Sequence, residues 1–97
     1  MIDDDCVEMD DIYIKILNSI LGSGKHFMDT TTILSRLDQH LNFDELQDRL
    51  QIIEDKCKYI ETEKRNGVGK NGVYRAKLTA LGRQFLADYE KRHLLPS

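Results

Sequence analysis

The chain of 97 residues has no tryptophan, one proline, two cysteines and no long hydrophobic run. No apolar segment approaches the ~20 residues that a membrane-spanning helix needs, so we expect no membrane partner. Cys6 and Cys57 stand far apart and outside any Cys-x-x-Cys pattern, which predicts neither a disulfide framework nor a zinc site. The acidic amino terminus differs from the basic start of a secretory signal, so we expect a cytoplasmic protein.

A catalytic or metal-binding pattern is also lacking. His26, His40 and His93 are scattered, and none lies at metal-ligand spacing from another histidine or a cysteine. A nucleophilic Cys57 would need exposure and a nearby base. It lies instead on the apolar stripe of a predicted helix, which favours a small buried hydrophobic residue. We therefore expect a protein that is not an enzyme and that uses neither a cofactor nor a metal ion.

The remaining composition is that of a small soluble domain. Hydrophobic residues make up 40% of the chain and charged residues 32%, which is ordinary for a globular protein. A chain of this length supports one hydrophobic core. We expect residues 1–9 to form an acidic lead-in and residues 10–95 to form a single domain.

Apolar residues at helical spacing predict four helices. Their approximate ranges are 10–21, 29–41, 42–57 and, from Thr79 onward, 79–90. Asn42 followed three residues later by Glu45 predicts a capping box at the start of the third helix. Little more than a turn separates the second and third helices, which is typical of a helix-turn-helix.

Between the third and fourth helices the apolar period changes to that of strands. Residues 59–65 and 72–79 flank the glycine-rich segment 66–71, which predicts a β-hairpin. Residues 25–28 can add a third strand. The sequence therefore predicts an α+β fold, with a three-helix core, a β-hairpin wing and a C-terminal helix.

Two motifs in this part of the chain carry a resemblance. The run IIEDKCKYIETEK precedes the hairpin, and YRAKLTALGRQFL follows its turn. Together they resemble the winged helix-turn-helix repressors of the MarR and PadR type over roughly residues 29–90. The positions in the expected order are Tyr74, Leu78, Thr79, Gly82 and Arg83, whereas Cys57 stands where that family generally has glycine. The resemblance implies a small transcriptional regulator that binds double-stranded DNA as a homodimer formed through its terminal helices.

Helix-turn-helix proteins place the third helix in the major groove of DNA. Gln47 and Gln51 could pair with adenine there, and Arg49 could pair with guanine. We expect the basic wing to contact phosphates through five cations, namely Lys64, Arg65, Lys70, Arg75 and Lys77.

The distribution of charge favours a different partner. Residues 1–59 carry six Lys/Arg and thirteen Asp/Glu, a net charge of −7, whereas residues 60–97 carry eight and four, a net charge of +4. Residues 29–56 alone have a net charge of −4, and affinity for DNA comes largely from neutralising phosphates. The alternative is therefore a winged-helix protein-interaction module, an adaptor or inhibitor. Its acidic second and third helices would dock a basic protein surface without binding DNA.

Overall fold

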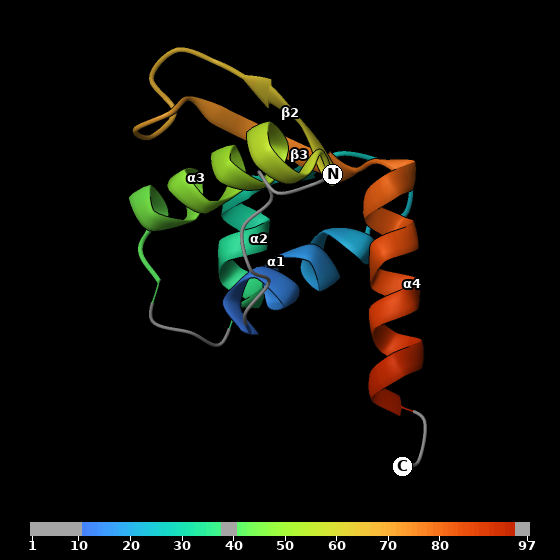
Figure 1. Ribbon diagram of the computed structural model, residues 1–97. Helices are drawn as coiled ribbons and strands as arrows, with labels where there is room; N and C mark the ends of the chain where they lie inside the picture. Colours follow the sequence, from blue (N-terminus) through green and yellow to red (C-terminus); the bar gives the residue numbers. More distant parts are fainter. Residues whose placement is uncertain (1–10, 38–40, 95–97) are drawn as a thin grey trace.

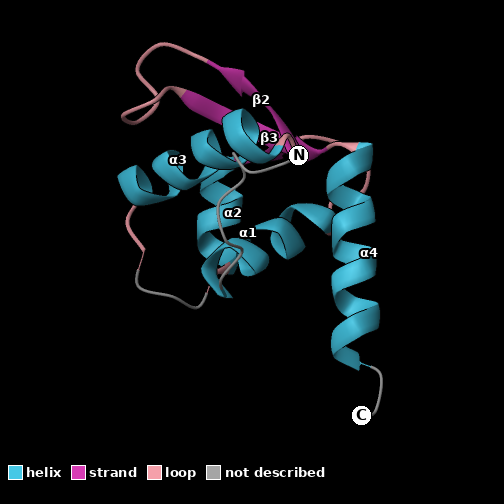
Figure 2. Cartoon of the chain, viewed as in Figure 1, coloured by secondary structure: helices cyan, strands magenta, loops and turns pink. Residues whose placement is uncertain are grey.

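The structure, a computed structural model, describes residues 11–37 and 41–94. The expected acidic lead-in, residues 1–9, lies outside the described residues. Within the two described ranges the fold is α+β, with four α-helices, one π-helical turn and three β-strands (Figures 1 and 2). In chain order the elements are α1 (Asp11–Leu21), β1 (Met28–Asp29), α2 (Thr30–Arg36), α3 (Phe43–Ile52), the π-helical turn η1 (Ile53–Cys57), β2 (Ile60–Lys64), β3 (Val73–Leu78) and α4 (Ala80–Leu94). This order is compatible with a winged helix.

The three strands form an antiparallel sheet in the order β1-β3-β2, with β3 in the centre. The sheet lies over the helices α1, α2 and α3, while α4 stands at one end of the molecule (Figure 2). Glu63 pairs with Arg75 but Lys64 pairs with Val73, so Tyr74 is an extra residue in β3. This bulge places Tyr74 and Arg75 together on the outer face of the sheet, between the buried Val73 and Ala76.

The predicted apolar stripes form the hydrophobic core. The fully buried apolar side chains on the helices are Ile16, Leu17 and Ile20 of α1, Ile33 of α2, and Leu46 and Leu50 of α3, continued by Ile53 of η1. The sheet closes the core with the inner face of β3, which buries Val73, Ala76 and Leu78. The apolar residues at helical spacing and those at strand spacing pack into this one cluster. Burial of these residues explains why the segments adopt their structures.

The predicted capping box of α3 is confirmed, and Thr79 caps the start of α4. The backbone N–H of Glu45 donates to Asn42 Oδ1 at 2.8 Å, and the backbone N–H of Asn42 donates to Glu45 Oε1 at 3.0 Å. The N–H of Gly82 donates to Thr79 Oγ1 at 3.0 Å. These bonds satisfy backbone donors that a helix start leaves without an intrahelical partner.

The boundaries of other elements differ from the sequence-based ranges. The second helix ends at Arg36, because Leu37 already has an extended backbone, and the first strand is Met28–Asp29 rather than 25–28. The third helix widens into the π-helical turn, in which the N–H of Lys58 donates to the backbone oxygen of Ile53, and it stops at Lys58, whose φ of 64° is left-handed. The left-handed residue of this turn is thus Lys58, one position after the cysteine that was matched to the family's glycine.

Cys57 is buried, as predicted, but it is not a free thiol. It belongs to a disulfide bond, so the expectation that the cysteines form no disulfide is wrong for this residue. The chain's other cysteine, Cys6, lies outside the described residues. None of the helices in the described ranges combines the length and apolarity required to cross a bilayer.

Candidate nucleic-acid interface

The loop of the β2–β3 hairpin is seated on the first turn of α3 (Figure 1). Gly69 makes this possible, because a Cβ at that position would lie 2.6 Å from Phe43 Cε2 and 2.9 Å from the Gln47 amide. Its φ of +58° also favours glycine. Next to it, Asn71 Nδ2 donates to the backbone oxygen of Gln47 at 3.2 Å and to Asp48 Oδ1 at 3.4 Å. The hairpin and α3 therefore form one continuous surface.

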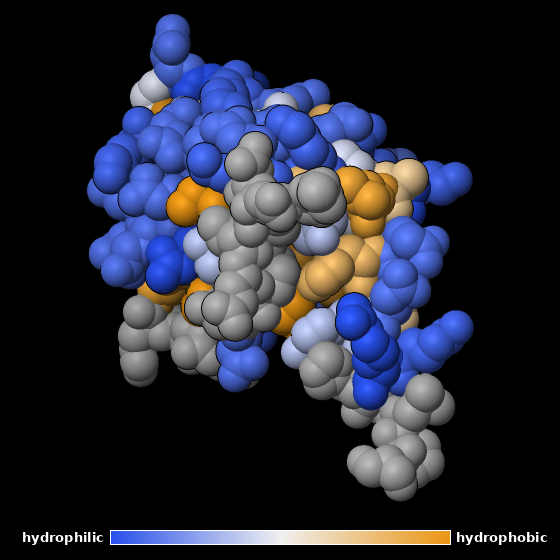
Figure 3. Space-filling view, viewed as in Figure 1, coloured by the Kyte–Doolittle hydropathy of each residue, from blue (hydrophilic) through white to orange (hydrophobic). Residues whose placement is uncertain are grey.

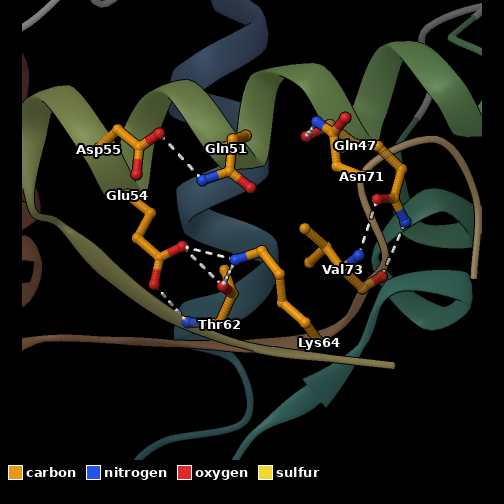
Figure 4. Close-up of polar contacts among 8 residues, drawn as sticks. All are labelled: Gln47, Gln51, Glu54, Asp55, Thr62, Lys64, Asn71 and Val73. Atoms are coloured by element: carbon orange, nitrogen blue, oxygen red, sulfur yellow. Dashed lines mark hydrogen bonds and ion pairs between the residues drawn. The ribbon is translucent and has the colours of Figure 1, made fainter. Parts of the chain in front are cut away.

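Gln47 is the centre of this junction and is fully buried. Its Nε2 donates to the backbone oxygen of Val73 at 2.7 Å, and the backbone N–H of Val73 donates to Gln47 Oε1 at 2.9 Å. Figure 4 shows the amide pointing at the Val73 backbone in the manner of a neighbouring strand. The prediction that Gln47 lies on the outer face of the third helix is wrong, because the start of β3 covers that position.

Arg49 also points away from the outer face. Its Cζ lies 5.8 Å from the centre of the Tyr13 ring on α1, and its Nε is buried without a hydrogen-bond partner. Gln51 remains half-exposed, and its Nε2 donates to Asp55 Oδ2 at 3.0 Å along the helix (Figure 4). Of the three predicted base-reading residues, Gln51 alone presents its polar group along the outer side of α3.

The five predicted wing cations divide between the two sides of the hairpin. On the side of α3, Lys64 Nζ lies 3.2 Å from Glu54 Oε1 and donates to Thr62 Oγ1 at 2.9 Å (Figure 4). Lys70 Nζ lies 3.2 Å from Asp48 Oδ2. Both lysines therefore contact carboxylates that belong to α3 or to η1.

On the outer face of the sheet the carboxylates come from β2. Arg75 Nε donates to Glu63 Oε1 at 2.7 Å, and Lys77 Nζ lies 3.9 Å from Glu61 Oε1. The hydrogen bond to Glu63 raises the pKa of the Arg75 guanidinium above its usual value. These are cross-strand pairs within the hairpin itself.

Aromatic rings separate the cations on this outer face. Arg65 Cζ lies 3.9 Å from the centre of the Tyr74 ring. Phe27 lies between Arg75 and Lys77, whose cationic groups are 5.4 Å and 4.9 Å from its ring centre. Such cation–π contacts restrain the long side chains while leaving their charges near solvent.

Sequence reasoning did not identify Asp48, Glu54 and Asn71 as partners of the wing. The cross-strand ion pairs follow from the alternation of side chains between the two faces of β2 and β3, once the register of these strands is known. The contacts with α3 and η1 join residues that are 10 to 24 positions apart, and no periodic pattern signals them. Phe27 precedes β1 and gave no signal in the sequence either.

Comparison of the chain with protein families, curated proteins and solved structures finds no match. The resemblance to the MarR and PadR repressors therefore stays a prediction. In the part of the chain that the structure describes, no three metal-ligating side chains gather at one point.

Proposed function

We propose that the chain is a winged-helix domain that binds double-stranded DNA chiefly through its wing, as a small transcriptional regulator. The observation that carries this proposal is the element order with the β1-β3-β2 sheet, which sets an exposed basic hairpin beside α3. The hairpin presents Lys64, Arg65 and Lys70 at its loop end, all of them exposed. Hydrophilic side chains cover this side of the molecule in Figure 3.

The same geometry argues for phosphate contacts rather than extensive base reading. Gln47 is buried, and Arg49 is turned toward Tyr13. Asp44 and Asp55 are exposed on α3 and η1 and would repel the phosphates flanking a groove. Gln51 is the remaining candidate for a base contact. We therefore expect binding that tolerates many sequences and depends strongly on salt.

Titration of a fluorescently labelled random duplex tests this function. Three phosphate contacts predict an affinity that falls about 40-fold between 50 and 200 mM salt. Replacing Lys64 and Lys70 by alanine should weaken binding to all sequences alike, whereas Lys91→Ala, an exposed position on α4, is the matched control. Gln51→Ala should alter sequence preference with little effect on the salt dependence. Absence of binding at 50 mM salt would refute the proposal.

A second candidate function is docking of a basic protein surface on α3. It is favoured by the exposed carboxylates of Asp44, Glu45 and Asp55, beside the half-exposed Asp48. In this case the DNA titration is flat, and a defined arginine-rich peptide binds instead. Asp44→Asn and Asp55→Asn should then weaken the peptide complex, while Asp88→Asn on α4 should not.

Homodimerisation is part of the first proposal and rests on the terminal helices. The apolar residues of the sequence that suit a dimer contact are Phe85, Leu86, Tyr89, Leu94 and Leu95, of which Leu95 lies outside the described residues. Leu86 is buried, and Phe85 stacks on Tyr59 at 4.7 Å, so part of this set already packs within the chain. Leu81 on α4 is 53% exposed, and hydrophobic side chains gather beside α4 in Figure 3. Sedimentation of the wild type and of Leu81→Ser tests the dimer.

The cytoplasmic location stays a prediction.

A further inference from the structure

Two of the wing's phosphate-contacting candidates are held by carboxylates of the neighbouring helix. Lys70 lies against Asp48 of α3, and Lys64 lies against Glu54 of η1, each with 3.2 Å between nitrogen and oxygen. All four side chains keep access to solvent, from 27% exposed for Glu54 to 59% for Lys70. The pairs therefore close the space between the hairpin and α3 without being sealed inside the protein.

The two carboxylates are themselves oriented by further donors. Thr62 donates its hydroxyl to Glu54 Oε1 at 2.6 Å and its backbone N–H to Glu54 Oε2 at 3.1 Å (Figure 4). Asn71 Nδ2 lies 3.4 Å from Asp48 Oδ1. Lysine ammonium, hydroxyl, amide and backbone N–H groups are the donors that proteins use for DNA phosphates. On this wing, the carboxylates of Asp48 and Glu54 already bind these donors.

We propose that Asp48 and Glu54 are internal competitors of DNA phosphate, which hold the wing lysines against α3 and lower the affinity of the free protein for DNA. This inference rests on the proposed DNA binding. When duplex DNA approaches, a phosphate replaces each carboxylate at the lysine. The exchange involves surface ion pairs of small individual strength, so it requires no unfolding of the hairpin.

Asp44 provides the matched control within α3. It is exposed on the same helix, one turn before Asp48, and it makes no ion pair with the described residues. Asp44→Asn removes the same charge near the same DNA surface but frees no lysine. Any excess effect of Asp48→Asn over Asp44→Asn therefore measures competition at Lys70 rather than general repulsion.

The experiment is a titration of labelled random duplex DNA at 50 mM salt with the full chain. We expect Asp48→Asn to bind about fivefold more tightly than the wild type and Asp44→Asn at most about twofold more tightly. Glu54→Gln, which keeps one of the two acceptor oxygens for Thr62, should also bind more tightly, whereas Glu90→Gln on α4 should not. Lys70→Ala should reduce affinity about threefold more in the Asp48→Asn background than in the wild type.

The outcomes separate the inference from the function on which it rests. Equal gains for Asp48→Asn and Asp44→Asn, or no coupling between Asp48 and Lys70, overturn the competition while the DNA binding of the wild type stands. Binding by Asp48→Asn alone, with none by the wild type, would refute DNA binding as the function of the wild type while supporting the competition at Lys70. Absence of binding by the wild type and by every variant overturns both proposals. Unfolding curves of the variants check that each retains its fold.

Discussion

The buried junction between the wing and α3 and the exposed ion pairs of the wing are held by different kinds of contact. At the junction, the Gln47 amide bonds both backbone groups of Val73 with no exposure to solvent. The four ion pairs of the wing leave every partner between 27% and 59% exposed. A buried polar group that loses its partner destabilises the fold, whereas an exposed ion pair contributes about 0–1 kcal/mol.

A second contact between uncharged groups joins the wing to α4. The backbone oxygen of Tyr59 accepts from the N–H of Thr79 at 2.9 Å, and Gly82 lies against the same peptide. The hairpin is therefore positioned by uncharged amide and backbone contacts. Its charged side chains are consequently available for exchange with a ligand while the hairpin keeps its place.

The largest effect on stability is expected at Gly82. A Cβ there would overlap the backbone oxygen of Tyr59, so Gly82→Ala should lower the free energy of unfolding by about 3 kcal/mol. In an ordinary helix the same change is favourable by about 1 kcal/mol. Ala87→Gly, at an exposed position of α4, should therefore cost about 1 kcal/mol as the control. Denaturant unfolding measures both, and a stabilised Gly82→Ala protein would contradict the close contact.

Gln47→Leu tests the buried junction between α3 and the wing. The carbonyl of Val73 keeps the hydroxyl of Thr30 at 3.2 Å, but its N–H loses its partner, so we expect a loss of about 2 kcal/mol. Gln51→Leu, on the same helix and half-exposed, should change stability by less than about 0.5 kcal/mol. Similar losses at both positions in denaturant titrations would remove the distinction between the buried and the exposed glutamine.

Lys58→Gly tests the turn that joins η1 to β2. A left-handed backbone costs a residue with a Cβ about 1–2 kcal/mol, and Lys58 has a φ of 64°. We expect glycine to raise the free energy of unfolding by about 1 kcal/mol. Lys58→Ala retains the Cβ and should show no gain, so equal stabilities of the glycine and alanine variants would count against the left-handed turn.

The smallest effect on stability is expected at Lys70. Its pair with Asp48 lies at the surface, so Lys70→Ala should change the free energy of unfolding by less than about 0.5 kcal/mol. The same variant should lose DNA affinity, measured by the duplex titration. A large loss of stability would show that this ion pair stabilises the fold as the buried contacts of the wing do, and would contradict its description as an exchangeable surface pair.

Local patterns predicted much of this architecture before any tertiary contact was known. The apolar stripes of α1 and α3, the Asn42–Glu45 capping box and the glycine-rich hairpin all follow from interactions within a few residues along the chain. Lys58 and the disulfide at Cys57 were missed. The turn depends on how the helix end meets the sheet, and a disulfide depends on which thiols the fold brings together.

The sequence by itself determined the order of helices and strands, because backbone periodicity, capping and turn chemistry act over short distances. It also determined that negative charge precedes positive charge along the chain. Only the tertiary structure decided that Gln47 faces the wing and that Lys64 and Lys70 meet carboxylates of α3 and η1. The physical reason is that a helix offers several faces, and packing against distant segments decides which of them remains exposed.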